Sequence, residues 1–221
     1  MNSYFRAGKP DTVLKMNMPG EYDAIVIGTG AGGGTLALHL AQAGKNILIL
    51  ERGPFMPQEK LNWDTSAVFL DNRYHTKETW QDKDGKPLHP QQAYFVGGQT
   101  KVYGAAMFRM RTEDFGVIQH KGGISPAWPI TYADMETSIP LHAYFKKRIP
   151  LEGVGHQNGT CRMGTDPATS VLDPHCKAHD LDNLYVVDAS CFVSASAVNP
   201  SLTIIANAIR VADHLLAERL N

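Results

Sequence analysis

The sequence predicts an α/β fold with a parallel sheet, because a strand, a helix and a second strand follow one another near its start. Residues 24–28 (AIVIG) are a short apolar run ending in glycine, which is typical of a buried strand. Residues 31–43 have the spacing of an amphipathic helix, and Gly44 can end it. Residues 46–50 (NILIL) form the second apolar run. Such a β-α-β unit joins parallel strands whose sheet is covered on both faces.

The composition predicts a globular protein and indicates its cellular compartment. The 221 residues are 43% apolar and 19% charged, as in globular proteins, and the net charge of −1 gives no electrostatic footprint for nucleic acid. No apolar run approaches the roughly 18 residues of a membrane span, and the first twenty residues lack a secretory signal. Three widely spaced cysteines favour free thiols in a reducing compartment. We therefore expect a cytoplasmic protein.

The other elements are predicted from shorter patterns. Residues 52–90 lack a clean period and are expected to be irregular and to wrap a ligand. Residues 93–108 are expected to form a strand, a glycine turn and an extended segment, and residues 181–188 are a strand candidate. Asn199 is a good N-cap for the last helix, with Pro200 in its first position. The polar side of that helix carries Asn207, Arg210, Asp213 and Glu218.

A glycine motif lies between the first strand and the first helix. Gly28, Gly30 and Gly33 form G-x-G-x-x-G, in which the glycines allow a tight turn, the approach of a pyrophosphate and close helix–strand packing. The helix N-terminus adds positive partial charge there. Glu51, 23 residues after Gly28, can accept hydrogen bonds from both ribose hydroxyls and argues against the 2′-phosphate of NADP. The motif predicts a bound NAD or FAD; a glycine-rich packing turn with a solvated Glu51 is the alternative.

Three stretches resemble the glucose–methanol–choline (GMC) oxidoreductases, FAD enzymes that oxidise alcohols. The first is the motif in its setting, residues 26–53, whose spacing is similar to the flavoprotein form. The second is VGGQTKVYGAAMFRMR at 96–111. The third is GHQNGTCRMG at 155–164, followed by the segment 181–215. The resemblance implies a Rossmann-like FAD-binding domain with FAD as its cofactor.

The resemblance also implies which residues contact the flavin. Tyr103 stands where many family members have asparagine, and Arg109 fits the family pattern of the second stretch. The residues implied to bind the cofactor, beyond those of the first motif, are Gly97, Gly98, Thr100, Gly104, Asp188, Ala189 and Pro200.

Two residues of the tail are implied to act on the substrate. Oxidation of an alcohol needs a base with a pKa near neutrality and a positive or dipolar neighbour for the reduced flavin. His156 matches the catalytic histidine of the family, and its alternative is a surface loop histidine. Asn199 matches the residue that hydrogen-bonds the substrate hydroxyl, and its alternative is a plain N-cap. The terminal helix would direct its N-terminus at the flavin.

The chain departs from the family in length. Residues 1–136 and 155–221 resemble the two parts of the FAD-binding domain, and 137–154 form a short link in place of most of the substrate domain. An incomplete sheet would leave an exposed edge, from which we expect self-association.

The leading prediction for the function is FAD-dependent oxidation of the CH–OH group of an alcohol or sugar, with an unknown electron acceptor. A non-catalytic FAD-binding remnant or interaction module is the alternative, and an NAD-binding dehydrogenase is a third. No metal site is expected, because His175, Cys176 and His179 lack a second cysteine pair at zinc spacing.

Overall fold

The computed structural model describes residues 21–82, 84–102, 109–120, 123–138, 156–195 and 199–220. Within these ranges, neither of the two α-helices could cross a membrane. The helices are α1 (Ala31–Gln42) and α2 (Ser201–Glu218), and the strands are β1 (Ala24–Ile27), β2 (Ile47–Leu50), β3 (Trp80–Gln81), β4 (Pro87–Leu88), β5 (Ile118–His120) and β6 (Gly123–Ser125). Single-turn 3-10 or π helices lie at Lys60–Trp63, Ser66–Leu70, Gly98–Lys101, Thr112–Phe115, Ala133–Ser138 and Ala189–Cys191.

The predicted β-α-β unit is present, and with it the α/β fold class is confirmed. Strands β1 and β2 are parallel, in a register that pairs Ala24 with Ile47 and Ile27 with Leu50. Gly44 ends α1 as expected: its φ is +85°, and its N–H donates to the Ala41 carbonyl at 3.0 Å.

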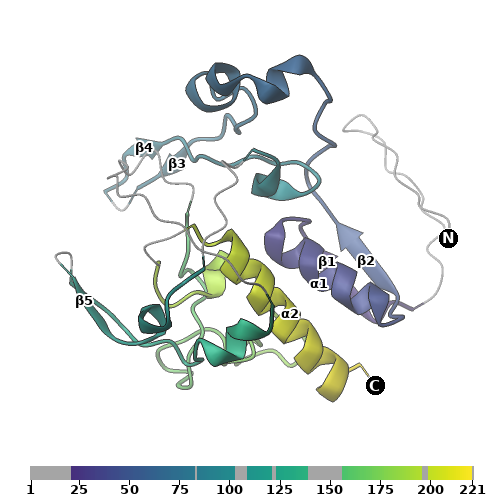
Figure 1. Ribbon diagram of the computed structural model, residues 1–221, viewed down its shortest axis with the longest axis vertical. Helices are drawn as coiled ribbons and strands as arrows, with labels where there is room; N and C mark the ends of the chain where they lie inside the picture. The colour runs from purple at the N-terminus through teal and green to yellow at the C-terminus, as the bar shows by residue number, and fades with distance from the viewer. Residues whose placement is uncertain are drawn as a thin grey trace.

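Helix α1 lies between the β1–β2 pair and α2 (Figure 1). Its buried Leu36 and Leu40 belong to the same core as Ala208 and Val211 of α2. Apolar residues recur along α2 at helical spacing, so one stripe of this long helix faces α1 and the core. The contact between α1 and α2 therefore joins the N-terminal β-α-β unit to the C-terminal helix.

The β1–β2 sheet is covered on one face only by the described residues. Val26 points to the α1 side and is buried, whereas Ile25 is 60% exposed and Ile27 is 82% exposed on the other face. The expected coverage of both faces is therefore not observed, because α2 packs on α1 and not on the sheet. The self-association expected from the incomplete sheet stays a prediction.

The prediction of a strand at residues 181–188 is wrong. In this segment Tyr185 forms only an isolated bridge with Lys177, and the Val186 N–H donates to the Cys176 carbonyl at 3.0 Å. The segment pairs with residues close to it in the chain and adds no strand to the β1–β2 sheet, which has two strands within the described ranges.

The prediction for residues 93–108 is correct for the glycine turn, but within its described part the strand and the extended segment are wrong. Gly97 and Gly98 have φ values of +98° and +58°, so the chain turns there and continues as the 3-10 helix Gly98–Lys101. Residues 103–108 lie outside the described residues.

Two expectations for α2 are also corrected. Pro200 is the N-cap and Ser201 begins the helix, so Asn199 lies one residue before the cap. Asn207 was expected on the polar side but is fully buried, because Cys176 and Cys191 pack against that side of the helix.

Candidate active site

A cavity of about 550 Å³ gathers most of the predicted site residues. Its walls come from the turn before α1, the 3-10 helix after Gly97, the His156 loop, the Ala189 turn and the start of α2. Glu51, Gly97 and Gly98 lie beside it without lining it, and Gly104 is outside the described residues. Nine predicted residues line the cavity: Gly28, Gly30, Gly33, Thr100, His156, Asp188, Ala189, Asn199 and Pro200.

The glycines of the first motif differ in what they do. A Cβ on Gly33 would lie 2.3 Å from the Gly28 carbonyl oxygen, and one on Gly32 would lie 2.3 Å from the Val187 carbonyl oxygen. These positions need glycine because α1 packs closely against the turn and against residues 187–188. A Cβ on Gly30 would meet no described atom within 4 Å. Gly30 therefore borders open space in the cavity and does not pack against the rest of the described chain.

Gly30→Ala should separate FAD binding from folding. Gly30 has φ −65°, which alanine adopts without strain, so the melting temperature of the apoprotein should change by no more than a few degrees. The added methyl group enters the cavity where a pyrophosphate would approach, so the dissociation constant for FAD should rise at least about tenfold. Flavin fluorescence quenching and thermal melting measure the two effects. Unchanged FAD affinity would show that this side of the turn is not a phosphate site.

The second glycine segment lies directly against the first motif. The Gly97 N–H donates to Thr29 Oγ1 at 2.8 Å, and a Cβ on Gly98 would lie 3.0 Å from Gly30 Cα. The Thr100 hydroxyl donates back to the Gly97 carbonyl, which closes the turn. The two glycine-rich stretches therefore form one continuous part of the cavity wall.

The Glu51 carboxylate accepts hydrogen bonds from Thr29 and Gly53. Its Oε2 accepts from the Thr29 N–H at 2.8 Å and the Thr29 hydroxyl at 2.5 Å, and its Oε1 accepts from the Gly53 N–H at 3.0 Å. Burial raises the pKa of Glu51, but these hydrogen bonds outweigh it and hold the pKa below the usual value. These hydrogen bonds use three of the about four acceptor positions of a carboxylate, and the contact of Glu51 with both ribose hydroxyls stays a prediction.

The His156 loop is held alongside the Ala189 turn by main-chain hydrogen bonds. Gly159 N–H donates to the Ala189 carbonyl at 3.3 Å, and Cys161 N–H donates to the Ser190 carbonyl at 2.9 Å. The His156 side chain is half-buried, and this burial lowers its pKa. The ring lines the cavity, and the lowered pKa favours the neutral imidazole, in which one ring nitrogen can accept a proton.

The start of α2 closes the cavity opposite the first motif. Pro200, Ser201 and Ile204 line it, and Asn199 lies just before them. No described side chain caps this helix end, so its first N–H groups and its positive partial charge are directed toward the cavity. The expected placement of the helix N-terminus at the ligand site agrees with this arrangement.

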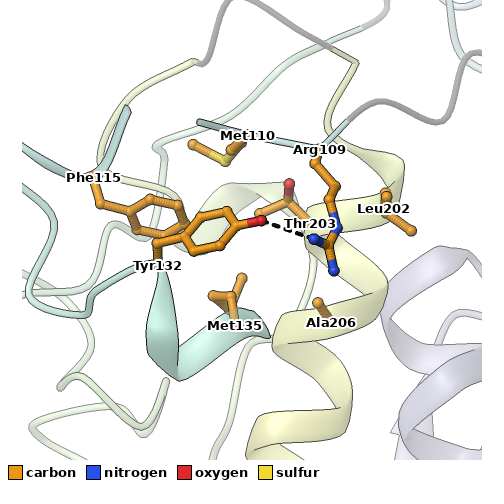
Figure 2. A pocket seen from close by; sticks show the side chains of 8 residues that line it. All are labelled: Arg109, Met110, Phe115, Tyr132, Met135, Leu202, Thr203 and Ala206. Atoms are coloured by element: carbon orange, nitrogen blue, oxygen red, sulfur yellow. Dashed lines mark hydrogen bonds between the residues drawn. The ribbon is translucent and has the colours of Figure 1, made fainter. Parts of the chain in front are cut away.

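A second, much smaller cavity lies on the other side of the first turns of α2. Figure 2 shows Arg109 beside Tyr132, whose hydroxyl accepts a hydrogen bond from Arg109 Nη1 at 3.0 Å. Leu202 and Ala206 of α2 form another wall. Its volume of about 30 Å³ suits a single water molecule and not a substrate. Arg109 thus lies on the side of α2 that carries Leu202 and Ala206, and it does not line the large cavity.

Comparison with known proteins identifies the family. The model of the GMC oxidoreductase family matches residues 101–208, and that of the FAD binding domain matches residues 23–100. The chain belongs to the GMC oxidoreductase family. The predicted family and the predicted cofactor, FAD, are thereby confirmed.

Three curated relatives align with parts of this GMC oxidoreductase. 6'''-Hydroxyparomomycin C oxidase of Streptomyces lividus is 46% identical over 72 residues, which is 31% of this chain and 13% of the relative. Paromamine 6'-oxidase of Streptomyces fradiae is 48% identical over 61 residues, 28% of this chain and 11% of the relative. The fructose dehydrogenase large subunit of Gluconobacter japonicus is 30% identical over 145 residues, 66% of this chain and 22% of the relative. The chain therefore spans less than a quarter of the length of these relatives.

The residues around the cavity of this chain suit FAD in their chemistry. The open space at Gly30 admits a pyrophosphate next to the N-terminus of α1. Glu51 retains an acceptor position at the end of β2. The N-terminus of α2 also lines the cavity, where its positive partial charge favours a negatively charged group.

Sequence reasoning did not single out the residues of segment 66–92 that line the cavity. The aromatic and polar side chains of an irregular segment were the signal, and the segment was expected to wrap a ligand. Gln92 Nε2 donates to Gln157 Oε1 at 2.7 Å and so links this segment to the His156 loop. The lining residues that it contributes are Phe69, His75, Trp80, Gln91 and Gln92.

Proposed function

We propose that this GMC oxidoreductase oxidises the CH–OH group of an alcohol or sugar, with His156 as the base and Asn199 as a polar partner of the substrate hydroxyl. The observation that carries the proposal is that both side chains line the cavity formed by the FAD-binding turn. The division into residues 1–136, 137–154 and 155–221 is part of the proposal, since most of the middle range lies outside the described residues.

The surroundings of His156 fit the work of a base. Its burial favours the neutral ring, which can accept the hydroxyl proton at a ring nitrogen at neutral pH. The main-chain bonds from Gly159 and Cys161 to the Ala189 turn fix the loop that carries it. FAD, when bound, supplies the acceptor for the hydride that leaves the carbon.

The start of α2 contributes electrostatics and orientation. Its uncapped N–H groups stabilise negative charge that develops across the cavity during the reaction. Asn199 lies before the N-cap and does not cap α2. Its amide can therefore hold the substrate hydroxyl in line with His156.

Anaerobic bleaching tests the proposed oxidation. The protein should purify yellow, and a panel of alcohols and sugars, with fructose and paromamine among them because relatives carry those names, should include a compound that bleaches the flavin absorbance. A His156→Asn variant that retains FAD serves as the control and should bleach far more slowly. A yellow protein that no compound bleaches would instead support a non-catalytic FAD-binding remnant.

The pH dependence of flavin reduction should report His156. Only the neutral ring accepts a proton, so kcat/KM should be constant near pH 7 and fall as the pH drops through the pKa of His156. Burial places that pKa below the usual value of about 6.5. Stopped-flow reduction between pH 5 and 9 measures the profile. An acid limb centred above pH 7 would contradict the assigned environment of this ring.

A further inference from the structure

Thr29, at the second position of the glycine motif, connects three separate segments of the chain. Its hydroxyl donates to Glu51 Oε2 at 2.5 Å and accepts from the Gly97 N–H at 2.8 Å. Its own N–H donates to the same Glu51 oxygen at 2.8 Å. One side chain thus joins the turn before α1, the end of β2 and the second glycine segment.

Both partners of Thr29 have positions that matter for a dinucleotide. Glu51 Oε2 accepts both Thr29 donors, so the position of this carboxylate depends on Thr29. Gly97 begins the turn that brings Gly98 within van der Waals contact of Gly30, at the edge of the phosphate space. A shift at either partner would move an atom directly beside the cavity wall that contains Gly28 and Gly30.

We propose that Thr29 is a positioning residue for FAD, which acts by holding Glu51 and the second glycine segment in place. The hydroxyl serves as donor and acceptor at once, so no apolar side chain of the same shape can replace it. Its bond to Glu51 is a charge-assisted hydrogen bond, the stronger class. The inference rests on FAD binding and not on the alcohol oxidation proposed above.

Substitutions at Thr29 separate the hydroxyl from the shape of the side chain. Thr29→Val keeps the shape and removes both hydroxyl bonds, whereas Thr29→Ser keeps the hydroxyl and removes a methyl group. Thr65→Val is the matched control, because Thr65 is exposed and makes no capping bond with its side chain. Each variant is prepared as the full chain with FAD removed, and FAD is titrated while flavin fluorescence is followed.

Thr29→Val should raise the dissociation constant for FAD about ten- to a hundredfold, from the loss of one neutral and one charge-assisted hydrogen bond. Thr29→Ser should stay within about threefold of the parent chain, and Thr65→Val should match it. Equal affinity in all three variants would overturn the proposal. A tenfold loss in Thr29→Ser would do so as well, even if Thr29→Val did not fold, because the hydroxyl is still present.

A double-mutant cycle distinguishes positioning from a general loss of stability. Glu51→Gln removes the charge of the partner, so adding Thr29→Val should then weaken FAD binding by a smaller factor than it does in the parent chain. The melting temperature of each apoprotein is measured in parallel. Additive effects on FAD affinity that follow the melting temperatures would show that Thr29 is only structural.

Discussion

Replacing His156 with asparagine should lower kcat/KM for the alcohol or sugar by about 10²–10⁴-fold, the range that a positioned base contributes. Asparagine keeps a polar side chain in the loop but cannot take up a proton from the substrate. FAD content should remain that of the parent chain, because main-chain hydrogen bonds to the Ala189 turn hold the loop without the His156 side chain. Stopped-flow flavin reduction under anaerobic conditions measures the rate.

The matched control for His156 is His89→Asn. His89 is exposed and lies outside the cavity, with its ring near the Glu78 carbonyl, so its loss should leave the reduction rate within about twofold. Equal rates in the two variants would show that His156 is a loop histidine without a role in proton transfer. A loss of FAD from the His156 variant would instead assign the residue to cofactor binding.

Asn207→Leu should lower the free energy of unfolding of the apoprotein by about 2–4 kcal/mol. The Asn207 amide is fully buried, and its Nδ2 lies 3.4 Å from both the Cys176 and the Cys191 sulfur atoms. Its Oδ1 accepts from Arg210 Nε at 3.1 Å and Nη2 at 2.8 Å. Leucine has a similar size but leaves the guanidinium without this acceptor. Urea denaturation followed by circular dichroism measures the change.

Asn183→Leu is the control, because Asn183 is exposed in a turn and a surface substitution there should change the free energy of unfolding by less than about 0.5 kcal/mol. The Asn207 variant should also bind FAD less tightly, since Cys191 ends the turn that carries Ala189 and Ser190 into the cavity wall. An Asn207 variant as stable as the control would show that the buried network adds nothing to the fold.

Local patterns predicted the elements that depend on local physics. The run at 24–28, the helical spacing of 31–43 and Gly44 describe the β-α-β unit within one or two residues. The roles of Gly28 and Gly33 followed from the same reasoning: Gly28 turns the chain at a φ of +88°, and the close packing of α1 leaves no room for a Cβ on Gly33. The motif of the tail predicted His156 at the ligand site, and His156 lines the same cavity as the first glycine motif.

Contacts between segments determine the features that local sequence patterns did not predict. Residues 181–188 are apolar enough for a strand, yet Val186 pairs with Cys176 nearby in the chain. Asn207 reads as polar surface, but two thiols and Arg210 satisfy it in the core. The role of Thr29 depends on Gly97, 68 residues away, and no local pattern marks that contact.

The walls of the cavity come from parts of the chain that are far apart in sequence, from the turn at Gly28 to the start of α2. Contacts between the walls stabilise the fold only after the long loops between them have closed. Loop closure costs entropy before these contacts form. A dinucleotide that touches all the walls binds the assembled chain and not its separate parts, so it draws the population toward the assembled state by mass action. FAD binding should therefore raise the stability of the folded chain by an amount that grows with the FAD concentration relative to the dissociation constant.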